Sequence, residues 1–385
     1  MTSEKNPITI PYTVFKPVGR AMEYITSVLE TGKTQGDGPF SEKSVDLLKK
    51  ITNGQKIILT SSGTDALEMA AILAGISAGD EVIMPSFTFV SSANSIVLRG
   101  GVPVFVDIDP KTLNICPKAI RLAITNKTKA IMPVHYAGVA CDMTAILEIA
   151  KEHHLKIIED AAHATGAMYK GKHLGTIGDF GALSFHETKN ISSGEGGALL
   201  VNDPKSFDRA EIVRDKGTNR KQFLRGEVNR YTWVDVGSSF LPSELQTALL
   251  ASQLEQLKDI NRRRIEIWNA YHNAFQQLEA KGFIQRPSLP EGCEHNGHIY
   301  WILVKGGERT RNDLSKHLAN HGIQATSHYE CLHTTPLAKQ YARSAEGGLP
   351  VTLNAVVSLL RMPLYVTLTD ESVDLVIQKV YEYFR

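Results

Sequence analysis

Short apolar runs alternate with stretches of helical periodicity through the first half of the chain. The apolar runs predict strands at residues 57–60, 81–84, 102–106, 130–134, 156–159, 180–185 and 198–201. Between them, the spacing of apolar residues predicts helices at 41–50, 91–98, 117–124 and 143–153. This alternation is typical of an α/β fold, in which helices cover both faces of a largely parallel sheet.

The second half of the chain carries a different pattern. Apolar positions at helical spacing over 243–278 predict one long helix that bridges two domains. The pattern then predicts a strand at 300–304, a helix at 311–320 and packing elements at 358–364 and 372–383. We expect a large α/β domain over residues 1–255 and a smaller α+β domain over 256–385. Residues up to Gly38 are poorly periodic, apart from a turn at 36–39.

Composition and charge exclude several classes of partner. The 385 residues carry a net charge of +1, so no overall field attracts nucleic acid or an anionic membrane. No apolar run approaches the ~20 residues of a membrane helix, and the amino end lacks a signal-peptide core. The four cysteines are widely spaced, and the cluster at 328–333 fits no common zinc pattern. These features predict a cytoplasmic enzyme or binding protein for a small molecule, without a structural metal.

Lys189 lies in the most distinctive stretch, where the predicted strand 180–185 gives way to a polar segment and a glycine turn. A single lysine is most often a solvated surface charge. A buried lysine with a lowered pKa can instead condense with a carbonyl compound. Neighbouring motifs must decide between these two interpretations.

Ligands of parallel sheets bind beyond the carboxyl ends of the strands. This rule selects residues 87–89, the pair at 135–136, and Asp160 with His163, besides Lys189 itself. Each has an ordinary alternative, because Asp160 could cap a helix, His163 could be a core histidine and Phe89 could be plain core. Their common position at the ends of predicted strands favours a shared site.

Residues 61–68 predict a small-residue turn that opens a helix. Free N–H groups at such a helix start, together with the hydroxyl of Thr64, form a natural phosphate site, although Ser-Gly-Thr is also an ordinary helix cap. A phosphate site, a reactive lysine, an aromatic plane and a carboxylate for a ring nitrogen are the usual protein partners of pyridoxal phosphate. We therefore expect pyridoxal 5'-phosphate as the cofactor.

Five segments in a fixed order resemble those of the DegT/DnrJ/EryC1/StrS family of sugar-nucleotide aminotransferases. They are Ser-Gly-Thr-Asp-Ala-Leu at 62–67, Gly-Asp-Glu-Val-Ile-Met-Pro-Ser-Phe-Thr-Phe at 79–89, Pro-Val-His-Tyr-Ala-Gly at 133–138, Glu-Asp-Ala-Ala-His at 159–163 and Ser-Phe-His-Glu-Thr-Lys-Asn at 184–190. The resemblance runs from about Gly32 to the C-terminus. It implies the type I fold of pyridoxal-phosphate enzymes, as in aspartate aminotransferase, and a homodimer with active sites at the subunit interface.

The resemblance also implies a role for individual residues. Lys189 matches the lysine that holds the cofactor aldehyde and transfers the proton. The other cofactor contacts that it implies are Gly63, Thr64, Asp65, Phe89, Asp160, His163, Ser184 and Ser239. Ser239 replaces the asparagine that family members use to reach the phosphate in the neighbouring subunit. Arg220 in a basic segment at 216–230, with His328 and Tyr329, is the candidate contact of the sugar nucleotide.

Further segments at 134–141, 186–190 and 216–220 resemble family members that form 4-amino-4,6-dideoxygalactose nucleotides for enterobacterial common antigen. This implies L-glutamate as the amino donor and dTDP-4-keto-6-deoxyglucose as the acceptor. Amination at C3, or formation of the 4-amino-glucose epimer, stays open. A P-loop or dinucleotide-binding protein would need a Gly-x-x-x-x-Gly-Lys-Ser/Thr or Gly-x-Gly-x-x-Gly motif between a strand and a helix, and neither is present. Regulatory or dehydratase relatives would lack the lysine.

Overall fold

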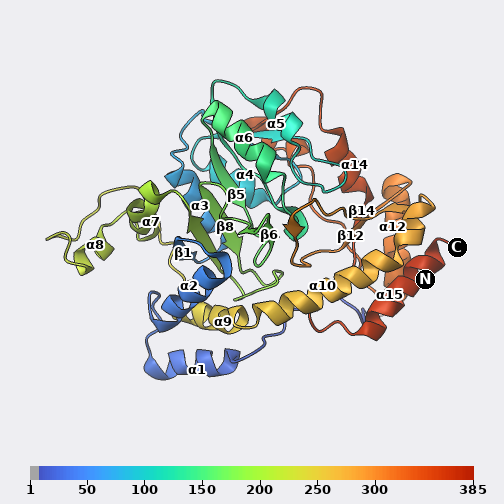
Figure 1. The fold of residues 1–385 in the computed structure, drawn as a ribbon, viewed down its shortest axis with the longest axis horizontal. Coiled ribbons are helices and arrows are strands. Elements are labelled where there is room, and N and C mark those ends of the chain that lie inside the picture. The colour runs from blue at the N-terminus through green and yellow to red at the C-terminus, as the bar shows by residue number, and fades with distance from the viewer. Residues whose placement is uncertain (1–7) are drawn as a thin grey trace.

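The computed structural model describes residues 8–385, and its centre is an eight-stranded sheet (Figure 1). The strand order is β1-β9-β8-β5-β4-β2-β3-β13. The strands are β1 (Lys56–Thr60), β2 (Glu81–Pro85), β3 (Val102–Val106), β4 (Thr128–Ile131), β5 (Lys156–Asp160), β8 (Phe180–Ser184), β9 (Gly197–Val201) and β13 (Arg343–Ser344). Strand β9 runs antiparallel to β1 and β8, and the other five strand pairings in this sheet of the described residues are parallel. The predicted largely parallel sheet is confirmed.

Helices bury both faces of this sheet. Ile57 and Leu59 of β1 pack in one core cluster, whereas Ile58 between them packs in the other. The first cluster includes residues of α2 (Pro39–Thr52), α5 (Pro117–Ala123) and α6 (Met143–His153). The second includes residues of α3 (Gly63–Leu73), α4 (Val90–Val97) and α7 (Phe207–Arg214). Burial on both faces explains why these strands are continuous apolar runs rather than alternating patterns.

The long helix predicted over 243–278 is wrong, because the structure divides it into three. These are α9 (Glu244–Leu254), α10 (Leu257–Ala274) and α11 (Gln276–Ala280). Ser243 and Gln246 form a capping box at the start of α9. The backbone at Gln256 (φ −101°, ψ 4°) leaves the helical region, and Phe275 does so again (φ −81°, ψ 3°). Apolar spacing alone does not reveal these breaks, since buried residues continue on both sides.

The chain beyond α10 forms a second core. Strands β10 (Ile284–Gln285), β12 (Trp301–Val304) and β14 (Leu359–Arg361) form an antiparallel sheet beside α12 (Gly307–Asn320), α14 (Pro350–Ser358) and α15 (Asp370–Tyr383). Ile10 from the amino end packs in this core and pairs with Ile323. The smaller α+β region is confirmed, whereas the boundary at residue 255 stays a prediction.

The remaining elements are short or were not predicted from the sequence. Helix α1 (Ala21–Thr31) lies in the segment that showed little periodicity, and α8 (Arg220–Leu224) lies in the basic segment at 216–230. Strands β6 (Met168–Tyr169), β7 (Lys172–His173) and β11 (Cys293–Glu294) form a small sheet. The short helices are α13 (Ala338–Tyr341), η1 (Tyr136–Gly138), η2 (Pro204–Ser206) and η3 (Leu332–Thr334).

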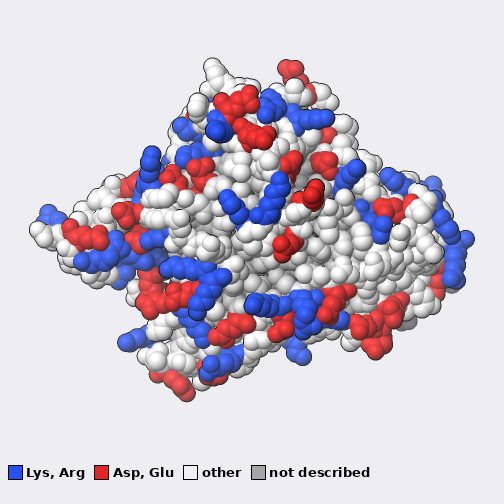
Figure 2. All heavy atoms as spheres, in the orientation of Figure 1, with Lys and Arg blue, Asp and Glu red and all other residues white. Residues whose placement is uncertain are grey.

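The surface shows no single dominant charge on the face in Figure 2, where acidic and basic side chains are interspersed. Within residues 8–385, no helix combines the length and apolarity needed to cross a bilayer.

Candidate active site

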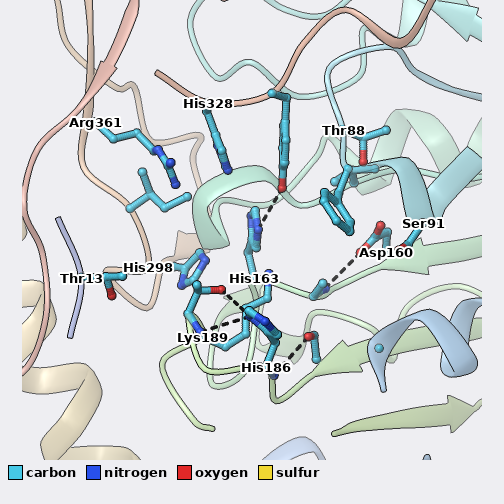
Figure 3. Close-up of a pocket in the computed structure, with 18 of the residues that line it drawn as sticks. Thr13, Thr88, Ser91, Asp160, His163, His186, Lys189, His298, His328 and Arg361 are labelled. Atoms are coloured by element: carbon cyan, nitrogen blue, oxygen red, sulfur yellow. Dashed lines mark hydrogen bonds between the residues drawn. The ribbon is translucent and has the colours of Figure 1, made fainter. Parts of the chain in front are cut away.

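A cavity of about 520 Å³ opens beyond the carboxyl ends of β5 and β8 (Figure 3). Nine residues predicted from the sequence line it, namely Gly63, Thr64, Phe89, Asp160, His163, Ser184, Lys189, His328 and Tyr329. These residues come from segments up to 266 positions apart in the sequence, and the fold brings them together as the rule for parallel sheets requires.

One end of the cavity is built to hold an anion. The N–H groups of Gly63 and Thr64, at the start of α3, meet no protein acceptor in the described part of the chain. A Cβ atom at residue 63 would lie 2.8 Å from Cβ of Ser184, so only glycine lets the two segments meet this closely. The Thr64 hydroxyl lies 2.8 Å from that of Ser91. Free amides and hydroxyls at a helix N-terminus suit a phosphate group.

Asp160, the last residue of β5, is held by hydrogen bonds on both carboxylate oxygens. Ser92 donates its hydroxyl to Oδ2 at 2.7 Å, and the backbone N–H of Ala162 donates to Oδ1 at 3.2 Å. Thr88 in turn lies 2.7 Å from Ser92. These bonds fix the carboxylate at the cavity wall but leave lone pairs for a protonated ring nitrogen.

His163 is neutral in this site and its tautomer follows from its partners. Burial and the nearby charge of Lys189 hold the pKa of its imidazole well below the usual value. The N–H of Ala137 donates to Nδ1, so the ring proton is on Nε2 and donates to the Tyr329 hydroxyl at 3.2 Å. The hydroxyl proton of Tyr329 is therefore free to point to another acceptor in the cavity.

Lys189 follows β8 in a tight turn, where its N–H donates to the carbonyl of His186. Burial lowers the pKa of its amine to about 8, an effect that Asp160 opposes and Arg361 reinforces. At neutral pH roughly a tenth of the amine is then uncharged, which is far more than for a solvated lysine. Lys189 therefore meets the requirement for a nucleophilic amine.

Two further histidines complete the wall beside Lys189. His298 donates from Nδ1 to Oδ1 of Asn190 at 2.8 Å, because the Asn190 amide uses both of its N–H groups elsewhere. Its ring lies 4.4 Å from that of His163. Nδ1 of His328 lies 2.9 Å from the Tyr136 hydroxyl, and the His328 ring stacks on that of Tyr329 with the centroids 3.8 Å apart.

Phe89 is 57% exposed although it lines the cavity. A large apolar ring that is exposed at a cavity wall has a face available to stack on a planar ligand. Its centroid lies 6.4 Å from that of Tyr329.

Three predicted residues lie away from this cavity. Asp65 directs its carboxylate to the Ser61 hydroxyl, and its N–H donates to the Ser62 hydroxyl that caps α3. Arg220 lies 3.7 Å from Asp215 at a second cavity, and Ser239 is exposed. Their roles toward cofactor and substrate stay predictions.

Sequence reasoning missed other residues that line the cavity, namely Tyr12, Thr13, Ser91, Arg264, His298 and Arg361, together with the supporting Ser92. Ser91 and Ser92 could have been found, because they begin the helix that follows β2. The others come from the amino end, α10 and the smaller region, where no strand-end rule applies.

The protein partners of pyridoxal phosphate are thus present in one cavity. The free amides of α3 would hold its phosphate, Phe89 would cover its ring, Asp160 would receive its ring nitrogen and Lys189 would bind its aldehyde. When bound, this cofactor supplies an electron sink for a substrate carbon.

Comparison with known proteins decides the family. Residues 18–381 match the model of the DegT/DnrJ/EryC1/StrS aminotransferase family. The chain belongs to this family. It is a sugar-nucleotide aminotransferase that uses pyridoxal 5'-phosphate.

Members of the family with similar sequences align along almost the whole chain. The spore coat polysaccharide biosynthesis protein SpsC of Bacillus subtilis is 35% identical and covers 96% of each chain. The GDP-perosamine synthase of Caulobacter vibrioides is 33% identical, over 93% of this chain and 94% of its own.

Solved structures of similar proteins share the fold. The sugar aminotransferase Spr1654 of Streptococcus pneumoniae, in its PMP form, superposes with a TM-score of 0.90 at 26% identity, covering 97% of this chain and 99% of its own. DesV of S. venezuelae, solved with a ketimine intermediate, gives a TM-score of 0.88 at 29% identity, over 98% and 99% of the two chains.

Proposed function

We propose that the enzyme transfers the amino group of L-glutamate to C4 of dTDP-4-dehydro-6-deoxy-D-glucose. The products are dTDP-4-amino-4,6-dideoxy-D-galactose and 2-oxoglutarate. The observation that carries the aminotransferase chemistry is the half-buried Lys189 amine in the same cavity as the Asp160 carboxylate. The segments at 134–141 and 186–190 support the choice of sugar, through their resemblance to enzymes that make this product.

The residues divide the work of two half-reactions. With the cofactor bound, the Lys189 amine would take the proton from the donor α-carbon, and it would deliver a proton in the reverse direction to C4 of the keto sugar. The Asp160 carboxylate would hold the cofactor's ring nitrogen protonated and so stabilise negative charge that develops on the substrate carbon. His163 and Tyr329 contribute uncharged hydrogen-bond donors at the wall. We propose His328 and Tyr329 as contacts of the sugar.

The decisive experiment is identification of the product by NMR. Wild-type enzyme, glutamate and the dTDP-4-keto sugar should give one aminated sugar whose C4 proton shows the galacto configuration. A gluco coupling pattern would identify the epimer, and amination at C3 would identify the other alternative. A parallel reaction with a GDP-linked 4-keto-6-deoxy sugar tests the nucleotide, because similar proteins include GDP-perosamine synthases. Turnover of the GDP sugar alone would contradict the proposal.

We also propose that the active form is a homodimer in which Ser239 reaches the cofactor phosphate of the partner subunit. Large apolar side chains are exposed along the segment that carries Ser239, at Tyr231 (50%), Trp233 (76%) and Val234 (51%). Exposure of several such residues together marks a surface that another chain covers. Arg220, also on this side, would then approach the sugar nucleotide of the partner site.

The dimer can be tested with Trp233→Asp, which introduces a charge into the proposed interface. The variant should sediment as a monomer and lose affinity for pyridoxal phosphate. Ser239→Ala should remain dimeric, but its Kd for the cofactor should rise roughly tenfold, because one hydrogen bond is lost. Leu122→Asp is the control, since Leu122 is 87% exposed on α5 and outside the proposed interface. A fully active monomer would contradict the proposal.

A further inference from the structure

Two histidines and a carboxylate meet in the smaller region, where none of them lines the active-site cavity. His317 lies in the last turn of α12, His321 directly follows that helix, and Glu382 lies in the last turn of α15. The two helices lie side by side near the C-terminus (Figure 1). Each of the three side chains offers one possible ligand atom, and these atoms lie within 4.8 Å of one another.

The packing of the two helices determines which side chains meet. Residues four apart on a helix share a face, and the ring centroids of His317 and His321 are 4.6 Å apart. Leu318 of α12 and Val380 of α15 are fully buried in the same core cluster. This core fixes the spacing of the helices, so the three polar side chains are held at one edge of it.

Each histidine is oriented by a backbone carbonyl. His317 donates from Nε2 to the carbonyl of Lys379 at 3.0 Å, and His321 donates from Nδ1 to the carbonyl of His317 at 2.9 Å. Because a carbonyl only accepts, these nitrogens carry the ring protons, and the other nitrogen of each neutral ring keeps a lone pair. Metal-binding histidines are fixed in the same way, although histidines that only cap a helix also bond to carbonyls.

The carboxylate of Glu382 favours the first of these interpretations. Its Oε2 accepts from the ammonium of Lys379 at 2.8 Å, and its Oε1 accepts from the amide of Gln378 at 2.8 Å. These bonds hold the pKa of Glu382 below its usual value, so the group is ionised at neutral pH. A cation therefore already binds this carboxylate beside the two rings, and a metal ion would compete with Lys379 for it.

The set of ligand atoms indicates the class of metal. Two imidazoles with one carboxylate suit Zn²⁺, whereas Mg²⁺ and Ca²⁺ prefer oxygen ligands alone. A tetrahedral zinc ion places its ligand atoms about 3.3 Å apart. The separations of up to 4.8 Å would close by small side-chain rotations, which the exposure of His321 allows. Three protein ligands leave one position for water.

We propose that His317, His321 and Glu382 bind a Zn²⁺ ion that bridges α12 and α15. We expected no structural metal from the sequence, because the cysteines are widely spaced and the cluster at 328–333 fits no zinc pattern. The His-x-x-x-His spacing at 317–321 becomes a metal site only when the fold adds Glu382 from the end of the chain. The proposal is independent of the sugar substrate.

The test titrates Zn²⁺ into holoenzyme that carries no polyhistidine tag and measures the Kd by calorimetry. His321→Ala and Glu382→Gln each remove one ligand and should raise the Kd by about 100-fold. Lys379→Met removes the competing ammonium and should lower the Kd by about tenfold. The control is His153→Ala on α6, where the histidine lies 3.6 Å from Glu152 without a third ligand, and its Kd should equal that of wild-type.

The second measurement is thermal unfolding with and without Zn²⁺. An ion that binds only the folded chain stabilises it, so Zn²⁺ should raise the Tm of wild-type and of the control but not that of Glu382→Gln, and Mg²⁺ should raise none of them. Retained pyridoxal phosphate and an unchanged far-ultraviolet spectrum show that each variant is folded.

Three results would overturn the proposal. Wild-type protein that binds no Zn²⁺ would leave the histidines as helix caps. Equal Zn²⁺ binding by wild-type, His321→Ala and Glu382→Gln would place the ion elsewhere. A raised Kd in Lys379→Met would contradict the competition between Lys379 and the metal at Glu382. None of these results would bear on transamination, because the three ligands lie outside the active-site cavity.

Discussion

Lys189→Ala should abolish transamination and the borohydride-reducible covalent link to pyridoxal phosphate. The variant loses both the amine that binds the aldehyde and the group that transfers the proton between substrate and cofactor. Loss of a general acid and base alone lowers rates by about 10²–10⁴-fold, and loss of the covalent attachment adds to it. The measurements are product formation from glutamate and the keto sugar, and mass spectrometry after borohydride treatment.

The control for this change is Lys151→Ala, at an exposed position in the last turn of α6. It should keep full activity and the reducible link. A second measurement uses the pKa of about 8 for Lys189. Because only the uncharged amine attacks the aldehyde, capture of pyridoxal phosphate by cofactor-free protein should rise about tenfold per pH unit below pH 8 and level off above it. If Lys189→Ala still formed the borohydride-reducible link to the same extent as wild-type, Lys189 would not be the residue that binds the aldehyde.

The part of the site on the large sheet could be predicted from the sequence. Asp160 ends one strand that is buried on both faces and Lys189 follows another, and such strands give unambiguous apolar runs with polar residues at their ends. The small residues at 62–64 directly follow the apolar run of β1, and this position predicts the helix start that suits an anion. Local sequence therefore determined which residues meet at the carboxyl edge.

The part contributed by the rest of the chain could not be predicted in this way. Arg361 ends a three-residue strand of the smaller region, and Tyr12 comes from a segment without periodicity. Their positions depend on how the smaller region packs against the large sheet. Local sequence patterns do not predict this packing. The break at Gln256 was missed for a related reason, since burial on both sides of it hides the change of direction.

Asp160→Asn should slow both half-reactions by about 100-fold while the protein still binds pyridoxal phosphate. The amide keeps the size of the side chain and can still accept the hydroxyl of Ser92, but it carries no charge to hold the ring nitrogen protonated. A hydrogen bond to a charged group is worth about 1.5–3 kcal/mol, which corresponds to a rate loss of about 10–150-fold if the bond acts in the transition state. Single-turnover rates with glutamate, and then with the keto sugar, measure the effect.

Two further variants show whether the charge or merely the shape of this side chain matters. Ser92→Ala removes the donor that holds Oδ2 of Asp160 and should cost only about tenfold, because the carboxylate keeps its charge and its bond from Ala162. Asp142→Asn makes the same chemical change at the cap of α6, where asparagine caps equally well, and should leave the rates unchanged. If Asp160→Asn reacted as fast as wild-type, the reaction would not need a protonated ring nitrogen. The role proposed for the Asp160 carboxylate would then be contradicted.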